Sequence, residues 1–211
     1  MKTLNKTMQA AITPAMAIDI LKEGNKRFMN NLKANRNLLE QANETSDGQH
    51  PFAVILSCID SRTSAELIFD QGLGDIFSIR IAGNIINEDI LGSMEFACKV
   101  AGSKIIVVLG HSKCGAVKGA CDHVELGNLT GLLRKIQPAI QSEKTEINNR
   151  NSSNAEFVEK VAQLNVAHTV SAIRERSPIL NDLIASGQVG ILGGMHNLSN
   201  GEVTFFEQTL D

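Results

Sequence analysis

Apolar residues recur along this 211-residue chain with two different spacings, and the change between them predicts its elements. Near the N-terminus they return every three or four positions, which predicts an amphipathic helix over residues 14–32 that begins after a capping Thr13. The polar residues 35–50 are expected to form a connecting loop. Beyond them, continuous apolar runs alternate with helical patterns. The runs predict buried strands at residues 52–57, 76–81, 104–109 and 188–195.

Helical patterns separate these runs and extend the alternation over the whole second half of the chain. They predict helices at residues 64–71, 88–100, 115–124, 129–142, 154–176 and 178–186. Asn200-Gly201 signals a tight hairpin, so residues 202–206 are expected to return as an antiparallel strand at a sheet edge. Continuous apolar strands separated by helices are typical of a parallel sheet covered on both faces.

The sequence therefore predicts an α/β fold with a mostly parallel central β-sheet. About four parallel strands plus an antiparallel C-terminal edge strand are flanked by helices, with an N-terminal helical arm. The length favours a single domain over residues 1–211. Within it we expect a flexible lead at 1–13, the helical arm at 14–33 and the α/β core at 51–211.

Composition excludes several classes of function. Lys and Arg number 20 against 23 Asp and Glu, and Trp and Tyr are absent, so neither a basic field nor a rich stacking surface is present for nucleic acid. No apolar run approaches the ~20 residues that a membrane span needs. The N-terminus lacks the apolar core of a secretory signal, and four cysteines are too few for a disulfide scaffold. We therefore expect a cytoplasmic protein.

Unusual side chains follow two of the predicted parallel strands, at the sheet edge where ligands of such folds bind. Cys58 follows the first strand, and His111 and Cys114 follow the third. Two thiolates and an imidazole favour zinc, and three protein ligands leave a position open, as in catalytic zinc sites. The alternative is that these are two unrelated core thiols and a capping histidine, the interpretation that we keep for Cys98 and Cys121.

Asp60 and Arg62 place opposite charges in the same turn as Cys58. An exposed ion pair without function, worth ~0–1 kcal/mol, is the alternative.

Together with the metal-ligand candidates, this turn resembles the β-class carbonic anhydrases, and the resemblance extends from about residue 14 to the final hairpin. The combination of motifs is highly specific, although each alone is weak. The resemblance rests on residues 21–28 of the first helix, 58–62 (Cys-Ile-Asp-Ser-Arg), 80–84 (Arg-Ile-Ala-Gly-Asn) and 110–115 (Gly-His-Ser-Lys-Cys-Gly).

The resemblance implies zinc-dependent, reversible hydration of carbon dioxide to bicarbonate and a proton, by attack of zinc-bound hydroxide. One zinc ion per chain would be held by Cys58, His111 and Cys114. Asp60 would orient the hydroxide and Arg62 would pair with Asp60. The family also has a closed form, in which this aspartate takes the fourth zinc position when its arginine is not engaged.

The resemblance further implies substrate-binding roles for Gln49, Phe77, Ala82 and Gly115. It implies a homodimer or homotetramer in which the N-terminal arm reaches a partner chain. Relatives with a second, regulatory bicarbonate site commonly use a Trp and a Tyr there, so their absence weighs against that regulation. The candidate proton relays are His50, His123, His168 and His196. For each, the alternative is an ordinary surface or core histidine.

Two thiolates cancel the charge of a zinc ion, so we expect the pKa of its bound water to lie above the ~7 of a three-histidine site. Activity should then rise above neutral pH. Two rival functions share the predicted zinc site: hydrolysis of carbon disulfide or carbonyl sulfide, and zinc or bicarbonate binding without turnover. A third, nucleotide binding, lacks the glycine-rich loops that it needs.

Overall fold

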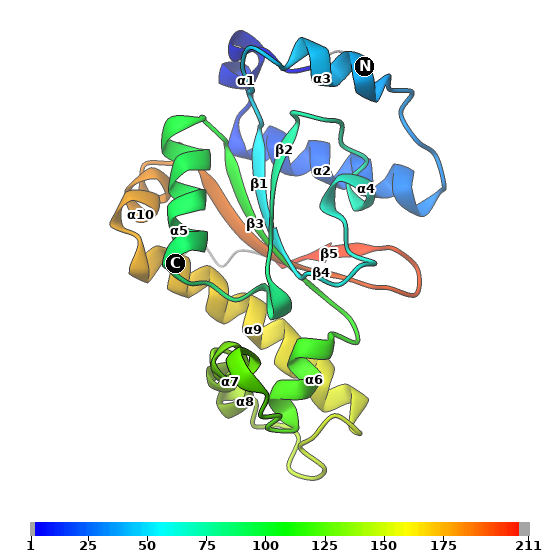
Figure 1. Ribbon diagram of the computed structural model, residues 1–211, viewed down its shortest axis with the longest axis vertical. Helices are drawn as coiled ribbons and strands as arrows, with labels where there is room; N and C mark the ends of the chain where they lie inside the picture. The colour runs from blue at the N-terminus through cyan, green and yellow to red at the C-terminus, as the bar shows by residue number, and fades with distance from the viewer. Residues whose placement is uncertain (1–2, 207–211) are drawn as a thin grey trace.

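A five-stranded sheet forms the centre of the computed structural model, which describes residues 3–206 (Figure 1). The strand order is β2-β1-β3-β4-β5; the first four strands are parallel and β5 is antiparallel to β4. This confirms the predicted α/β class and the antiparallel edge strand. The strands are β1 (Ala53–Ser57), β2 (Ile76–Arg80), β3 (Ile105–His111), β4 (Gly190–His196) and β5 (Val203–Phe205).

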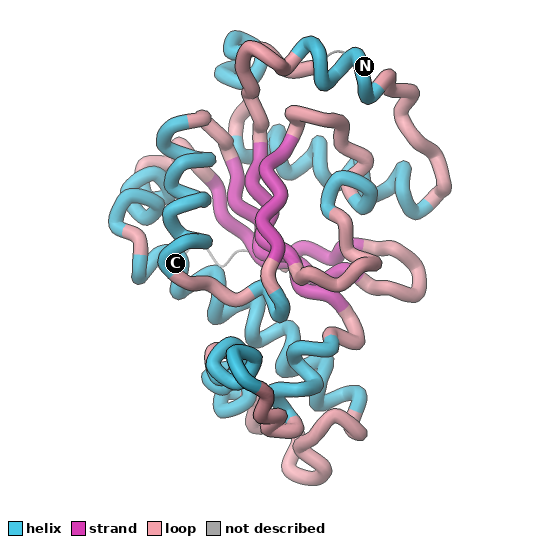
Figure 2. Tube along the Cα trace, in the orientation of Figure 1, coloured by secondary structure: helices cyan, strands magenta, loops and turns pink. Residues whose placement is uncertain are grey.

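Helices cover both faces of the sheet, as Figure 2 shows, and alternate strand residues divide between them. On one face, Ile55 and Val107 pack with Leu21 of α2 and Phe69, next to α4. On the opposite face the neighbouring strand residues pack against α5, α9 and α10. Because β1 and β3 are covered twice, every one of their residues is buried. The helices are α1 (Lys6–Ala11), α2 (Pro14–Met29), α3 (Leu38–Glu44), α4 (Ala65–Ile68), α5 (Glu88–Glu95), α6 (Gly115–Cys121), α7 (Gly127–Arg134), α8 (Gln137–Ser142), α9 (Ala155–Arg176) and α10 (Pro178–Ala185).

The N-terminal segment is more ordered than the sequence predicts. Residues 1–2 of the predicted flexible lead lie outside the described residues, but α1 forms within it and is anchored by Gln9, whose amide donates to the carbonyls of Pro51 and Ala101 at 2.7 and 2.8 Å. Likewise α3 forms within the predicted loop, where Gln41 is buried. Both helices are short and depend on tertiary contacts, which leave no periodic pattern in the sequence.

Three local features differ from the regular elements that the sequence predicts. The helix predicted at 129–142 is divided into α7 and α8, with Pro138 in the first turn of α8. Residues 82–84 form a short 3₁₀ turn (η1, Ala82–Asn84), and α5 continues into a π-helical turn (η2, Phe96–Val100). No helix in the described part of the chain is long and apolar enough to cross a bilayer.

Candidate metal centre

The strand order brings the three predicted metal ligands together. β1 lies directly beside β3 in parallel register, so the carboxyl ends of both strands meet at one edge of the sheet. Cys58 follows β1, His111 ends β3, and Cys114 is the residue that precedes α6. Their ligand atoms all lie within 4.8 Å of one another, and all three residues are buried. No other cysteine, histidine or carboxylate of the described residues joins this group.

The atoms of the group are arranged as a cation would require. The Sγ atoms of Cys58 and Cys114 lie 4.0 Å apart. Nδ1 of His111 lies 3.0 Å from the carbonyl oxygen of Ser112, which can only accept, so Nδ1 carries the proton and Nε2 keeps its lone pair. Nε2 is buried and has no hydrogen-bond partner among the described residues. An unpaired buried nitrogen is costly, which indicates that it binds something else.

The two thiols also favour a bound cation. The contact with Cys114 and, less strongly, the hydrogen bond from the backbone N–H of Gly83 lower the pKa of the Cys58 thiol to about 4 against the effect of burial. The same contact and burial raise the pKa of Cys114, since a second thiolate would lie beside the first. A divalent ion would allow both to ionise. Two thiolates and an imidazole suit zinc, and three ligands leave one position open.

Asp60 forms a bidentate ion pair with Arg62 in the turn that follows Cys58. Nε and Nη2 of Arg62 donate to Oδ1 and Oδ2 of Asp60 at 2.9 and 2.7 Å, and the backbone N–H of Arg62 donates to Oδ1 at 3.0 Å. The hydrogen bonds from Arg62 hold the pKa of Asp60 well below its usual range. The carboxylate therefore stays ionised and can accept a further hydrogen bond.

Arg80 and Thr63 stabilise this turn, and a role was predicted for neither. The Arg80 guanidinium reaches from the edge strand β2 and donates to the carbonyls of Cys58 and Asp60 at 3.1 and 2.6 Å. The Thr63 hydroxyl is within donating distance of the same two carbonyls, at 3.2 and 2.9 Å. Arg80 belongs to the motif at residues 80–84, but nothing in the sequence indicates that its side chain binds a backbone carbonyl 22 positions away.

The four predicted substrate-binding residues divide into two pairs. Ala82 lies beside Cys58, because the next N–H, of Gly83, donates to Cys58 Sγ at 3.4 Å. Gly115 is exposed and opens α6 directly after Cys114. Gln49 and Phe77 do not lie at this centre within one chain.

Gln49 precedes β1 and is therefore beyond the amino end of the strand, whereas Cys58 follows the carboxyl end. Phe77 pairs in register with Val54, and the four residue steps from Val54 to Cys58 span about 13 Å of strand.

Of the four candidate relay histidines, His196 lies closest to the centre. It ends β4 in register with His111 and is 3% exposed. Burial lowers the pKa of His196 to about 4, so the ring is neutral near pH 7. It lines a cavity of about 470 Å³ together with Arg62 and Phe28. His168 instead contacts the Ser142 hydroxyl at 2.9 Å, between α9 and α8.

Comparison with known proteins gives one consistent result. The family model described as carbonic anhydrase matches residues 53–203. Carbonic anhydrase 2 of Mycobacterium tuberculosis is 36% identical over 194 residues, which cover 89% of this chain and 90% of that protein.

Solved structures of similar fold include the β-carbonic anhydrase CcaA, with a TM-score of 0.73 and 24% identity over 92% of this chain and 89% of that one. Another belongs to the tetrameric β-carbonic anhydrases of the ascomycete Sordaria macrospora, with a TM-score of 0.70 and 22% identity over 92% of this chain and 95% of that one. At these identities the two structures support the fold alone.

Proposed function

The chain belongs to the β-class carbonic anhydrases, an enzyme family, and from this premise we propose that it catalyses the reversible hydration of carbon dioxide with one zinc ion per chain. The observation that carries the proposal is the buried group of Cys58, His111 and Cys114, with an unpartnered imidazole nitrogen, next to the Asp60–Arg62 pair. Water and carbon dioxide give bicarbonate and a proton: the water oxygen bonds to carbon, the electron pair of one C=O π bond moves to its oxygen, and one O–H bond of the water breaks.

Cys58, His111 and Cys114 would hold the metal. Bound zinc would lower the pKa of a water molecule and so supply hydroxide near neutral pH. The Ser112 carbonyl fixes the imidazole tautomer, so that Nε2 is ready as a ligand.

Asp60 orients the attacking oxygen. Its ionised carboxylate accepts a hydrogen bond from that oxygen, which aims a lone pair at the carbon of the substrate. Arg62 fixes the carboxylate in place, and Arg80 holds the backbone that carries it. The released proton passes to a buffer base, since His196 is buried and resists protonation.

The substrate is small and apolar, so its site needs an apolar wall and few donors. We assign part of that wall to Ala82 beside Cys58. The N–H groups in the first turn of a helix have no partner within the helix, so the Gly115 N–H is suited to hold a bicarbonate oxygen.

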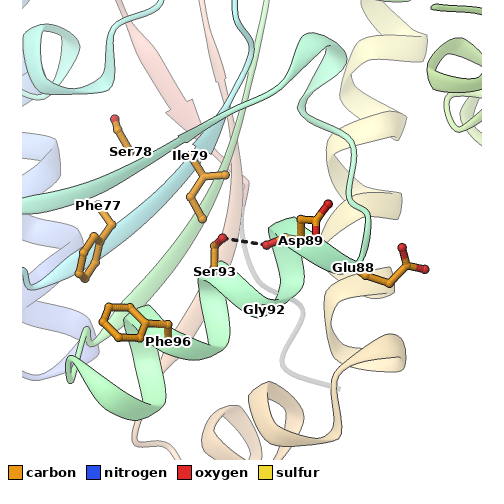
Figure 3. Close-up of a pocket in the computed structure, with 8 residues that line it drawn as sticks. All are labelled: Phe77, Ser78, Ile79, Glu88, Asp89, Gly92, Ser93 and Phe96. Carbon is orange, nitrogen blue, oxygen red and sulfur yellow. Dashed lines mark hydrogen bonds between the residues drawn. The ribbon is translucent and has the colours of Figure 1, made fainter. Parts of the chain in front are cut away.

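We further propose that two or more copies of the chain assemble, as a homodimer or homotetramer. β2 is an edge strand of the sheet. Beside it lies a groove of about 680 Å³ between β2 and α5, in which the rings of Phe77 and Phe96 meet edge to face, with their centroids 6.2 Å apart (Figure 3). Phe96 and Val100 are 51% and 70% exposed, and a second copy would cover them.

Assembly would also explain the distance of Gln49 and Phe77 from the metal ligands of their own chain. We propose that both residues serve the site of a partner copy. Light scattering after size exclusion tests the assembly, and Phe96→Asp should shift the protein towards monomer if β2 and α5 form the interface.

We expect the enzyme to act in the cytoplasm, since none of the four cysteines forms a disulfide.

Stopped-flow hydration of carbon dioxide, with zinc content measured on the same samples, tests the function. Wild-type protein should hold one zinc per chain and hydrate carbon dioxide with a rate that rises above pH 7. A chelator or His111→Ala should remove the zinc and the activity together. Zinc-loaded protein without hydration from about pH 7 to 9 would reduce the proposal to zinc binding or hydrolysis of a related substrate.

A further inference from the structure

We propose that Asn165 of α9 is a positioning residue for the Cys58 sulfur, although it contacts no ligand atom itself. Asn165 is 3% exposed, and its Nδ2 donates to the carbonyl oxygen of Gly83 at 2.8 Å. The contact is buried and joins residues 82 positions apart. A buried side-chain amide aimed at a single distant carbonyl fixes where that peptide lies.

The peptide that Asn165 fixes belongs to the turn that touches the metal centre. The N–H of Gly83 donates to Cys58 Sγ at 3.4 Å. Gly83 has φ +68, and an added Cβ would meet Cδ1 of Ile136 at 2.8 Å, so the position requires glycine. Gly83 has no side chain to pack, so hydrogen bonds to the backbone help to orient the turn, and the one from Asn165 is the shortest from another element.

The resulting chain of contacts runs from Asn165 to the C=O of Gly83, across the Cα of Gly83 to its N–H in the preceding peptide group, and from there to the Cys58 sulfur. A backbone N–H donated to a thiolate is charge-assisted; it withdraws charge from the sulfur and restricts its direction. Such contacts behind metal ligands set both metal affinity and the electronic properties of the metal. Asn165 therefore holds the sulfur towards His111 and Cys114 and moderates its basicity.

Asn25 offers a matched control on the opposite face of the sheet. It is also buried in a helix, and its Nδ2 donates to the carbonyls of Ile68 and Gly201 at 3.1 and 2.9 Å. Asn25→Ala should therefore lower the free energy of unfolding without touching the metal centre.

The experiment compares wild type, Asn165→Ala, Asn165→Ser and Asn25→Ala. Zinc affinity is measured by competition with a chelator, the sulfur-to-cobalt absorption bands are recorded after Co²⁺ substitution, and unfolding is followed in urea. Both Asn165 variants should bind zinc about tenfold or more weakly and shift the cobalt bands. Asn25→Ala should retain wild-type values for both. The serine variant leaves a smaller cavity and answers the question if the alanine variant does not fold.

This inference rests on the proposed function only in taking zinc as the cation held by the three ligands. Wild-type protein that binds neither zinc nor Co²⁺ would overturn the proposed function. Wild type that binds zinc, with Asn165 variants of equal affinity and unchanged cobalt bands, would overturn the role of Asn165 alone, whatever their stability.

Discussion

Asp60 and Asp70 both bind arginine side chains, but the two clusters differ in burial and in the sequence separation that they bridge. Asp60 pairs with Arg62 two positions away, and the Arg62 side chain is 57% exposed. Asp70 pairs with Arg36 and Arg27, 34 and 43 positions away, and both Asp70 and Arg36 are 7% exposed.

The difference separates a charge pair to which we assign a role in catalysis from one that holds the fold together. A pair within one turn closes no long loop, and its arginine is largely exposed, so it adds little to stability. The Asp70 cluster ties α2 and the segment after it to α4, and the backbone N–H of Ala34 also donates to Asp70 at 3.1 Å. Its value lies in holding the N-terminal arm against the core. The same substitution at each aspartate tests this contrast.

The largest effect is expected from Asp60→Asn on catalysis. The amide loses one acceptor oxygen and can no longer orient the attacking oxygen, so kcat/KM for carbon dioxide should fall by roughly 10²–10³. Zinc content should stay at the wild-type level, and the free energy of unfolding should change by less than about 1 kcal/mol. Stopped-flow and urea unfolding measure the two. A variant that unfolds easily while retaining its rate would reverse the assignment.

Asp70→Asn should give the opposite pattern. Asparagine tolerates the left-handed backbone of this position (φ +43), so the change isolates the charge. Removing the carboxylate that two arginines share should destabilise the fold by about 3 kcal/mol. The rate per folded, zinc-loaded molecule should remain near wild type. A rate that collapsed while the free energy of unfolding stayed at the wild-type value would show that the N-terminal arm has a catalytic role and not only a structural one.

A smaller, pH-dependent effect is expected at Glu143, a third carboxylate that binds arginine. Burial raises its pKa, but hydrogen bonds from Thr145, the Glu146 N–H and Arg150 outweigh burial and lower the pKa to about 2. A group whose pKa is lowered by folding contributes stability above its unfolded pKa of about 4.5, and this contribution disappears as the pH falls towards 2. Urea unfolding from pH 6 to pH 3 should therefore show a steeper loss for wild type than for Glu143→Gln. Parallel curves would show that the contacts do not perturb this carboxyl group.

These contrasts also show which parts of the molecule the sequence could predict. Cys58 and His111 were predictable because each follows a strand whose apolar run is unmistakable, and parallel order brings strand ends together. Asp60 and Arg62 were predictable because they are neighbours in one turn. The Asp70 cluster, Gln9 of α1 and Asn165 were not, since each acts across at least 34 positions on partners that no periodicity marks.

The resemblance to a known family contributed what neither pattern nor single-chain geometry supplies. Substrate-binding roles for Gln49 and Phe77 come from it and stay predictions. The roles of Ala82 and Gly115 are also predictions, but these two residues lie close to metal ligands of their own chain. The oligomer is likewise a prediction, supported by the groove beside β2 and the exposed Phe96 and Val100.

The parallel pairing of β1 with β3 also constrains how the protein matures. Cys58 and Cys114 are 56 positions apart in the chain. The segment between them contains α4, β2 and α5, so their side chains meet only once β1 and β3 have paired. Pairings between residues so far apart in the chain carry a loop-closure cost and slow folding. A chain in which β1 and β3 have not paired lacks the complete ligand set. With zinc bound as proposed, metal content would report the fraction of molecules in which this pairing is complete, and the ion would stabilise the folded state over the unfolded one.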